Sequence, residues 1–155
     1  MAGRIDAKLR KLDIDLPTPM APIANYVPAT ITGTLVVISG QLPAIDGKVA
    51  FTGKVPTNLT IEQGAAATRQ SFINVLVHLK AACNGDLDRV KRVVRLGGFV
   101  ACPPDFTQHA TVMNGASDLA VAIFGEAGRH ARTTIGVPSL PLDAAVEVEG
   151  MFEIG

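Results

Sequence analysis

Charged side chains are scarce in this 155-residue chain, where 14 lysines and arginines and 14 aspartates and glutamates make up 18% of the residues. Ordinary soluble domains carry about 25%. The formal net charge is zero, so no overall basic field favours nucleic acid or an anionic membrane. A small domain has a large surface for its volume, and large apolar patches mark contact surfaces. We therefore expect part of this surface to be buried against other copies of the chain.

Residues with specialised chemistry are also few. Tryptophan is absent, and the two cysteines, Cys83 and Cys102, fit no metal-ligand spacing. Two thiols make no disulfide framework, so we expect small buried hydrophobes in a reducing cytosol. The three histidines lack metal-binding spacing, and the glycines match neither a dinucleotide fingerprint nor a P-loop. No apolar run approaches the roughly 20 residues of a membrane helix, and the N-terminus lacks a signal-peptide core. We expect a cytoplasmic protein without a metal site.

The spacing of apolar residues predicts an α+β fold. Helices are expected over Ile5 to Leu12, over 60–83 and over 106–125. The helix over 60–83 is expected to begin with a capping box at Thr60 and Gln63 and to carry one apolar stripe. Strands are expected within 26–42, where Thr32-Gly33 makes a hairpin, and over 89–101, 132–138 and 145–154, with a loop at 43–58. This order favours a mixed, mostly antiparallel sheet with the two long helices on one face, and the low charge favours subunit contact on the other. Residues 1–20 are expected to form an N-terminal arm, and 21–155 a single domain.

The segment GRHARTTIG at 128–136 places Arg132 at the start of an apolar strand. A guanidinium cannot lose its charge, so it must be solvated, paired or kept for an anionic ligand. Glu147 in the alternating VEVEG run is a candidate partner if the last two strands are neighbours. One interpretation is a structural ion pair; the other is an arginine that grips a carboxylate while the glutamate orients a water or moves a proton. Arg129 and His130, in a glycine-rich loop, are expected to be solvated.

The remaining candidates favour structural interpretations. We expect His78 to flank the apolar face of its helix and His109 to have a cap or surface role. Ser39 is not in a G-x-S-x-G elbow, which argues against a nucleophilic serine. A basic group could touch RNA phosphates, but aromatics are 5% of the chain and none interleaves with it, so the solvated face of a strand is favoured. This group comprises Arg89, Lys91, Arg92 and Arg95.

Several segments together resemble the reactive intermediate deaminase superfamily, also called the Rid, YjgF or L-PSP proteins. They are VVISGQLP at 36–43, RQSFINVLVHLKAA at 69–82, Asn114, HART at 130–133 and LPLDAAVEVEG at 140–150. The resemblance runs from about Tyr26 to the C-terminus. It implies a chorismate-mutase-like fold and a homotrimer whose three sheets form an inner barrel, with sites in clefts between subunits. Active members hydrolyse reactive enamines and imines, such as 2-aminoacrylate, to 2-keto acids and ammonia without a metal or organic cofactor.

The resemblance also implies roles for individual residues. The family's carboxylate-binding arginine matches Arg132, and its water-orienting glutamate matches Glu147. Its site tyrosine matches Tyr26, the glycine of its SGQ motif matches Gly40, and its second-helix asparagine matches Asn114. We therefore expect catalysis from the arginine and glutamate, with substrate contacts from the other three and from backbone groups around Arg132 and Thr134.

The chain departs from the family pattern beside the arginine. The usual Pro-x-Arg is His130-Ala-Arg132 here, so His130 is a candidate titrating group in the pocket, with solvent or the subunit seam as the alternative. The small thiol common two residues after the arginine is Thr134. The turn before Arg132 is therefore expected to differ in shape from that of the usual family members. The range of preferred substrates is expected to differ as well. Two further functions remain open: an RNA-cleaving or translation-inhibiting protein, and a catalytically silent trimer that binds a small carboxylate.

Overall fold

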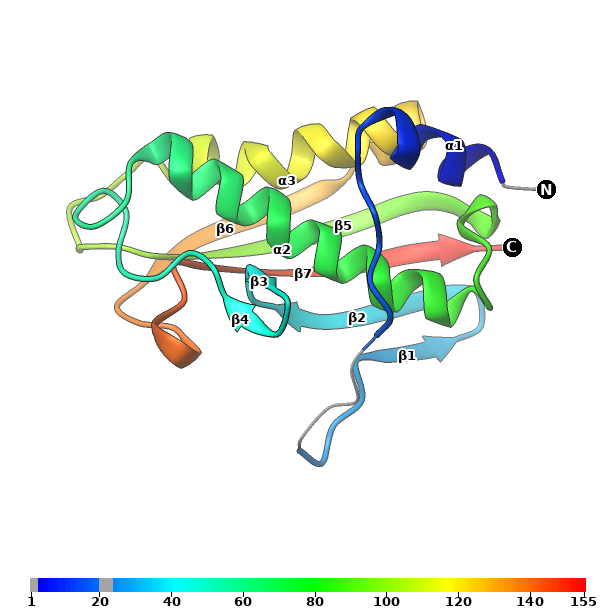
Figure 1. The fold of residues 1–155 in the computed structure, drawn as a ribbon, viewed down its shortest axis with the longest axis horizontal. Coiled ribbons are helices and arrows are strands. Elements are labelled where there is room, and N and C mark those ends of the chain that lie inside the picture. Colours follow the sequence, from blue (N-terminus) through cyan, green and yellow to red (C-terminus); the bar gives the residue numbers. More distant parts are fainter. Residues whose placement is uncertain (1–2, 20–23) are drawn as a thin grey trace.

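The structure, a computed structural model, describes residues 3–19 and 24–155. A five-stranded sheet carries the helices on one face, and a two-stranded hairpin stands beside it (Figure 1). The helices are α1 (Arg4–Lys11), α2 (Ile61–Ala82) and α3 (His109–Phe124), with 3-10 turns at Leu87–Arg89, Gly125–Gly128 and Pro141–Asp143. The strands are β1 (Ala29–Thr32), β2 (Leu35–Gln41), β3 (Ala44–Ile45), β4 (Lys48–Val49), β5 (Val90–Ala101), β6 (Ala131–Val137) and β7 (Val146–Ile154).

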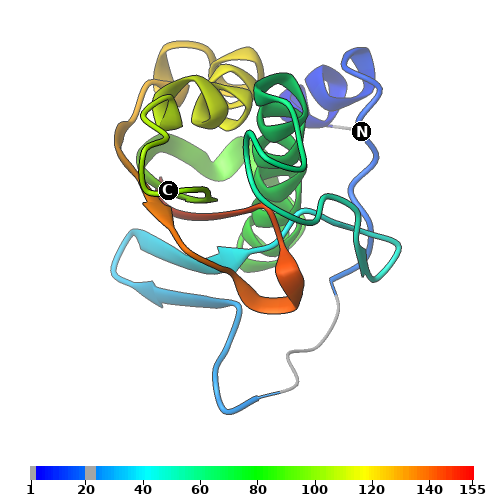
Figure 2. The same cartoon turned by 90° about the vertical axis from the view of Figure 1, so that its left-hand side faces the viewer.

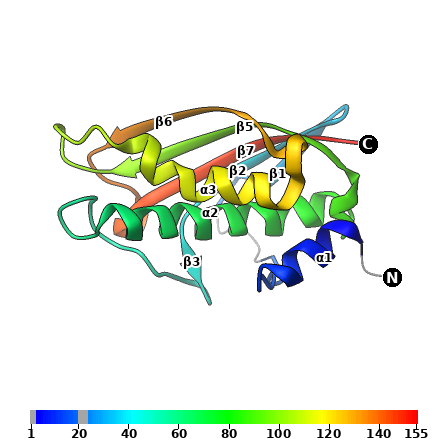
Figure 3. The ribbon, with the colours of Figure 1, turned by 90° about the horizontal axis from the view of Figure 1, so that it is seen from above.

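The large sheet is mixed, in the order β1-β2-β7-β5-β6. Only β5 and β6 pair in parallel, and the other neighbours are antiparallel. Figure 3 shows α2 and α3 side by side along one face, and the end-on view in Figure 2 separates helices from sheet. The predicted α+β class, with a mostly antiparallel sheet and helices on one face, is confirmed.

The predicted capping box at the start of α2 is present. The side chain of Thr60 accepts from the backbone N–H of Gln63 at 3.1 Å, and the Gln63 side chain accepts from the Thr60 N–H at 2.8 Å. Two of the helix's first orphan donors are thereby satisfied. Phe72, Leu76 and Leu79 on its apolar face are fully buried, so the helix forms because it is capped and because one stripe packs into the core.

The Asn114-Gly115 pair, which weakens a helix prediction locally, lies where α3 crosses α2. A Cβ on Gly115 would collide with the carbonyl of Ala65 on α2, so only glycine permits this approach. Beside it, the hydroxyl of Thr68 donates to the carbonyl oxygen of Val112 at 2.7 Å. The close contact fixes the position of α3, and with it the Asn114 side chain, relative to the rest of the fold.

The short α1 is held by residues far along the chain. The backbone N–H groups of Arg4 and Ile5 each donate to the Asp88 carboxylate at 2.8 Å, and Lys80 on α2 pairs with Asp6 at 2.9 Å. Ile5 and Leu9 are buried in the main core. An eight-residue helix is marginal alone, so these tertiary contacts stabilise it.

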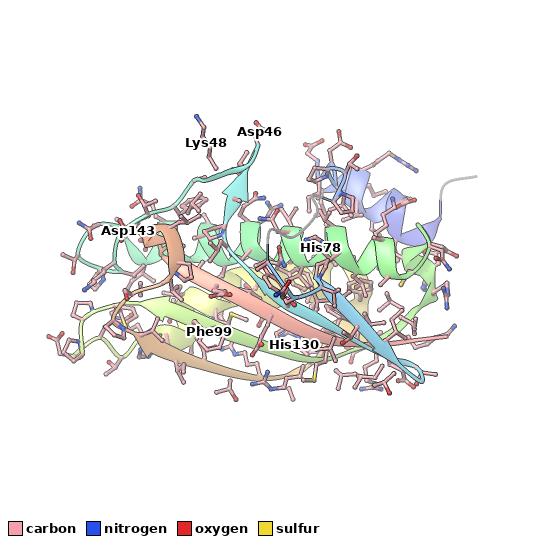
Figure 4. The ribbon with its side chains drawn as sticks, turned by 90° about the horizontal axis from the view of Figure 1, so that it is seen from below. Asp46, Lys48, His78, Phe99, His130 and Asp143 are labelled. Atoms are coloured by element: carbon pink, nitrogen blue, oxygen red, sulfur yellow. The ribbon has the colours of Figure 1, made fainter. Side chains whose placement is uncertain are left out.

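The expectation of a loop over 43–58 is wrong in part. Strands β3 and β4 form a hairpin there, closed by Asp46 and Gly47, whose φ angles are 52° and 78°. Two positive φ values in succession suit a tight two-residue hairpin turn. Figure 4 shows Asp46 and Lys48 at its tip, pointing away from the sheet.

The face of the large sheet that the helices leave open is mixed in character. Residues on this face alternate with core residues along each strand. The register of the strands places five apolar side chains and one ion pair on this face. The apolar set is Leu35, Val37, Phe99, Ile135 and Met151, all half-buried or exposed. The ion pair joins Arg95 on β5 to Glu149 on β7 at 3.6 Å. No helix within the described ranges is both long and apolar enough to cross a membrane.

Candidate functional site

Arg132 lies on β6, the last strand of the sheet, and its side chain reaches the helix side. Its Nη1 donates to the Asn114 side-chain oxygen at 2.8 Å and to the Ser117 hydroxyl at 3.0 Å. Its Nη2 is 3.4 Å from the carbonyl oxygen of Ala110. All three partners lie on α3 and are uncharged. Within residues 3–19 and 24–155 no carboxylate pairs with this guanidinium, which leaves its positive charge available to an anionic ligand.

His130 is only partly solvated, in contrast to the expectation from its loop position. The side chain is half-buried; Nε2 lies 2.8 Å from the Ser117 hydroxyl and Nδ1 lies 2.7 Å from the carbonyl oxygen of Gly128. Burial lowers the pKa of His130, the bond to Gly128 opposes that change, and the charge of Arg132 reinforces it. Arg129 beside it is exposed as expected, and pairs with Glu126 at 3.2 Å.

Thr134 follows Arg132 on the same face of β6. Its hydroxyl is buried and has no hydrogen-bond partner in the part of the chain that the structure describes. Buried polar groups in native proteins are almost always paired, so an orphaned hydroxyl beside the arginine is unusual. We call Asn114, Ser117, His130, Arg132 and Thr134 the arginine half-site.

Glu147 lies on β7, on the open face of the sheet. It is half-buried, opposite Phe99 in register. Its carboxylate covers Gly40 so closely that a Cβ there would collide with Oε1. Burial raises the pKa of Glu147, and the like charge of Glu149 raises it further. A carboxyl group with a raised pKa is suited to proton transfer near neutral pH.

The two residues expected to pair, Arg132 and Glu147, are kept apart within one chain. Strand β5 lies between their strands, so the condition for this pairing, that β6 and β7 are neighbours, is not met. Two strand spacings are about 10 Å, and the side chains also project from opposite faces of the sheet. A structural ion pair between them inside one chain is therefore excluded.

Tyr26 is 58% exposed and lines a cleft of about 1060 Å³. The cleft is bounded by the N-terminal arm, the β3–β4 hairpin and α2, and it includes Gly40 but none of the arginine half-site. Two amide side chains on α2, Gln70 and Asn74, bond to the carbonyl oxygens of Leu42 and Ala44 along its wall. We call Tyr26, Gly40 and Glu147 the glutamate half-site.

Other chemical groups lie outside both half-sites. Cys83 and Cys102 are buried and unpaired, as predicted for small hydrophobes. His109 is half-buried, with Nε2 3.6 Å from the Cys102 sulfur and its ring against Phe106. Burial raises the pKa of Cys102, which disfavours a reactive thiolate. No three histidine, cysteine or acidic side chains gather in a metal-binding cluster among the residues placed.

Ser117 is the site residue that sequence reasoning missed. Ser117 lies three residues after Asn114, and Ala110 lies four residues before Asn114, so all three occupy one face of α3. Helical residues three or four apart share a face. Once Asn114 was singled out, that spacing was the available signal for Ser117, but it carried no sign that the facing strand would present an arginine.

Comparisons with known proteins agree with this fold. The family model described as "YjgF/chorismate mutase-like, putative endoribonuclease" matches residues 6–154. The chain belongs to that family, which confirms the resemblance stated from sequence. The TCP17 protein of Trypanosoma cruzi is 47% identical over 154 residues, covering 99% of this chain and 96% of its own.

Two crystal structures resemble the chain over nearly its full length. Atu1372 of Agrobacterium tumefaciens, described as of unknown function, is 44% identical and superimposes with a TM-score of 0.91, covering 97% of this chain and 94% of its own. A "putative endoribonuclease" of Shewanella oneidensis MR-1 is 35% identical with a TM-score of 0.93, covering 98% of this chain and 100% of its own.

Proposed function

We propose that the chain is an enzyme that hydrolyses small reactive enamines and imines, such as 2-aminoacrylate and related 2-imino acids, to 2-keto acids and ammonia. Family membership supports this reaction class. The observation that carries the proposal is that uncharged groups hold the guanidinium of Arg132 at the edge of the sheet. No carboxylate of the described chain neutralises its charge. A substrate carboxylate supplies the missing anion.

The proposal includes a homotrimer with active sites between subunits. Arg132 and Glu147 lie on opposite faces of one sheet, so a site that uses both takes each from a different copy. The apolar side chains on the open face, including Phe99 and Met151, support contact between copies there. In this arrangement three open faces form an inner barrel, and the helices lie outside.

The proposed chemistry needs few groups. Arg132 binds the carboxylate, and backbone groups near Thr134, on the unpaired edge of β6, contact the imine nitrogen. Glu147 orients a water molecule toward the C=N carbon and accepts its proton as the new C–O bond forms and the C=N electron pair moves to nitrogen. Glu147 then returns that proton to nitrogen, and ammonia leaves as the C=O bond forms and the hydroxyl proton passes back to Glu147. A protonated imine is already electrophilic, so the reaction proceeds without a metal or organic cofactor.

A coupled assay tests the proposal. A pyridoxal-phosphate dehydratase generates 2-aminoacrylate or 2-iminobutyrate, and 2-keto acid release is followed with wild type, Arg132→Ala and Arg129→Ala. We expect acceleration by wild type and by Arg129→Ala, whose guanidinium is exposed and paired with Glu126, but not by Arg132→Ala. Equal acceleration by Arg132→Ala overturns the proposal, and so does tight binding of 2-oxobutanoate by a wild type that turns nothing over.

A second candidate is an endoribonuclease, because the family description and the name of the Shewanella relative both carry that activity. Within the basic group, Arg95 is already paired with Glu149, and Arg89 donates to the carbonyl of Gly155. Ribonuclease activity that survives rigorous purification and disappears in Lys91→Ala/Arg92→Ala, with imine hydrolysis unchanged, would support this candidate. Activity lost during purification would dismiss it.

A further inference from the structure

We propose that Ser117 and His130 are positioning residues: they hold the Arg132 guanidinium so that one edge, formed by Nε and Nη2, receives a ligand's carboxylate side-on. The inference rests on the proposed function only in naming that carboxylate as the substrate's. Neither residue is expected to touch the reacting atoms. The inference follows from five hydrogen bonds and from the polarity of each group that makes them.

The contact between His130 and Gly128 fixes the histidine tautomer. A carbonyl oxygen can only accept, so the proton of this 2.7 Å bond belongs to Nδ1. In the neutral ring, which burial and the nearby arginine favour, Nε2 is then an acceptor. The Ser117 hydroxyl, 2.8 Å away, donates to it. Figure 4 labels His130 near the start of β6.

The direction of this bond determines what Ser117 offers Arg132. With its only proton donated to His130, the hydroxyl presents lone pairs to Nη1 at 3.0 Å. The reverse orientation would aim the hydroxyl proton at the guanidinium and leave Nε2 without its donor. His130 therefore orders Ser117, and Ser117 orders Arg132.

The residues that contact His130 on either side both lie on or against α3. A Cβ on Gly128 would collide with the carbonyl of Ala120, so the 3-10 turn that carries Gly128 lies directly against α3. Ser117 is on the same helix. One ring nitrogen of His130 is thus anchored to α3 and the other to the turn packed against α3, so the imidazole acts as a rigid spacer between the helix and the start of β6.

The remaining donors of Arg132 define where an anion fits. Nη1 has two protons, and Asn114 and Ser117 accept both. Nη2 donates one proton to the carbonyl oxygen of Ala110, over a long 3.4 Å, and Nε–H has no partner among the residues described. The parallel pair of free donors is therefore the Nε–Nη2 edge, which matches the two oxygens of a carboxylate. The geometry selects side-on over end-on binding.

Nuclear magnetic resonance of ¹⁵N-labelled protein tests the inference without any catalytic assay. Long-range proton–nitrogen spectra distinguish the Nδ1–H from the Nε2–H tautomer, with His130→Gln used to assign the ring signals. We expect His130 in the neutral Nδ1–H form, and Ser117→Ala should shift its Nε2 signal while leaving His78 unchanged. An Nε2–H tautomer, or an Nε2 signal indifferent to Ser117→Ala, overturns the relay whatever the protein's activity.

Kinetics test the consequence for binding. A hydrogen bond to a charged group is typically worth a factor of about ten or more in affinity. We expect Ser117→Ala and His130→Phe to raise KM for 2-iminobutyrate about tenfold, with kcat changed less than about threefold. His130→Gln offers an amide oxygen near the Nε2 position, so it should recover most of the affinity, as should Ser117→Thr. Arg129→Gln, beside His130 but outside the relay, is the matched control.

The outcomes separate the two proposals. An active wild type whose Ser117→Ala variant keeps its KM, or loses kcat as severely as affinity, overturns the positioning role but leaves the imine hydrolase intact. A wild type without hydrolase activity overturns the proposed function, and the tautomer spectra then decide the relay alone. Failure of His130→Gln to recover what His130→Phe loses, with both variants folded by circular dichroism, also overturns the relay.

Discussion

The arginine and glutamate half-sites hold their central side chains by different means. Arg132 donates directional hydrogen bonds to Asn114 and Ser117, so its position is defined atom by atom. Glu147 has no hydrogen-bond partner among the described residues. Its carboxylate occupies the space that a side chain at position 40 would fill, and burial raises its pKa. The difference suits the proposed roles, because a binding group needs a fixed orientation whereas a proton-transfer group needs a matched pKa.

The largest effect expected comes from separating the half-sites between chains. Arg132→Ala and Glu147→Gln should each lower kcat/KM by a factor of about 10² or more, as is usual for a lost binding charge or general base. If each site takes one residue from each of two copies, co-refolding the variants in equal amounts rebuilds some intact sites. Random assembly should restore about a quarter of wild-type activity. The coupled imine assay measures this recovery.

The controls for this experiment are each variant refolded alone, which should stay inactive. Native mass spectrometry of the mixture confirms that both chains share one oligomer. A mixed oligomer without recovered activity would show that a site does not combine the two half-sites from different copies.

A methyl group at Gly40 should damage only the glutamate half-site. In Gly40→Ala the new Cβ occupies the space of the Glu147 carboxylate, which must turn away. Displacement of a catalytic group by about 1 Å can cost up to 10²-fold in rate, so we expect kcat to fall about ten- to hundredfold with KM little changed. Steady-state kinetics on 2-iminobutyrate measure both. A matching rise in KM would contradict the separation of roles.

A methyl group at Gly115 should disturb the arginine half-site from behind. In Gly115→Ala the Cβ presses on the carbonyl of Ala65, so α3 must move away from α2 and carry Asn114 with it. Overpacking of this kind costs about 1–3 kcal/mol in the free energy of unfolding, which lowers Tm by a few degrees. We expect KM to rise several-fold. Calorimetry and kinetics check the two effects.

The smallest effect expected concerns pH. Because the pKa of Glu147 is raised, first by burial and then by Glu149, a base at this position loses activity as pH falls through that raised value. Glu149→Gln removes the like charge but not the burial, so the pKa of Glu147 should fall. The acid limb of the kcat profile should then move to lower pH while staying above that of an ordinary glutamate. Glu153→Gln, on the same face of β7, is the control and should leave the limb in place.

Local sequence patterns predicted the helices and strands well where residues a few positions apart define one face of the element. The capping box at Thr60 and the apolar stripe of α2 are confirmed, and so is the β1–β2 hairpin around Gly33, because each depends on residues a few positions apart. The hairpin at 43–58 was missed although Asp46-Gly47 is a typical turn pair; its strands are two residues each, too short for an alternating pattern.

Strand order and the surroundings of His130 could not be read from local patterns. Nothing in the segments at 132–138 and 145–154 shows that β5 inserts between them, because periodicity defines a face of a strand but not its neighbour. The same holds for His130, whose loop position indicates solvent although Ser117 and Gly128 enclose it. The functional roles of Arg132, Glu147 and the residues around them remain predictions.

The cap on α1 has a consequence for the order of events during synthesis. The carboxylate that binds the first turn of α1 belongs to Asp88, and the ammonium that pairs with Asp6 belongs to Lys80. A ribosome makes α1 before it makes either of these residues. Since so short a helix is marginal without tertiary contacts, α1 settles only after segments that are translated later. Until the chain has been made past the start of β5, this segment is available to chaperones and proteases.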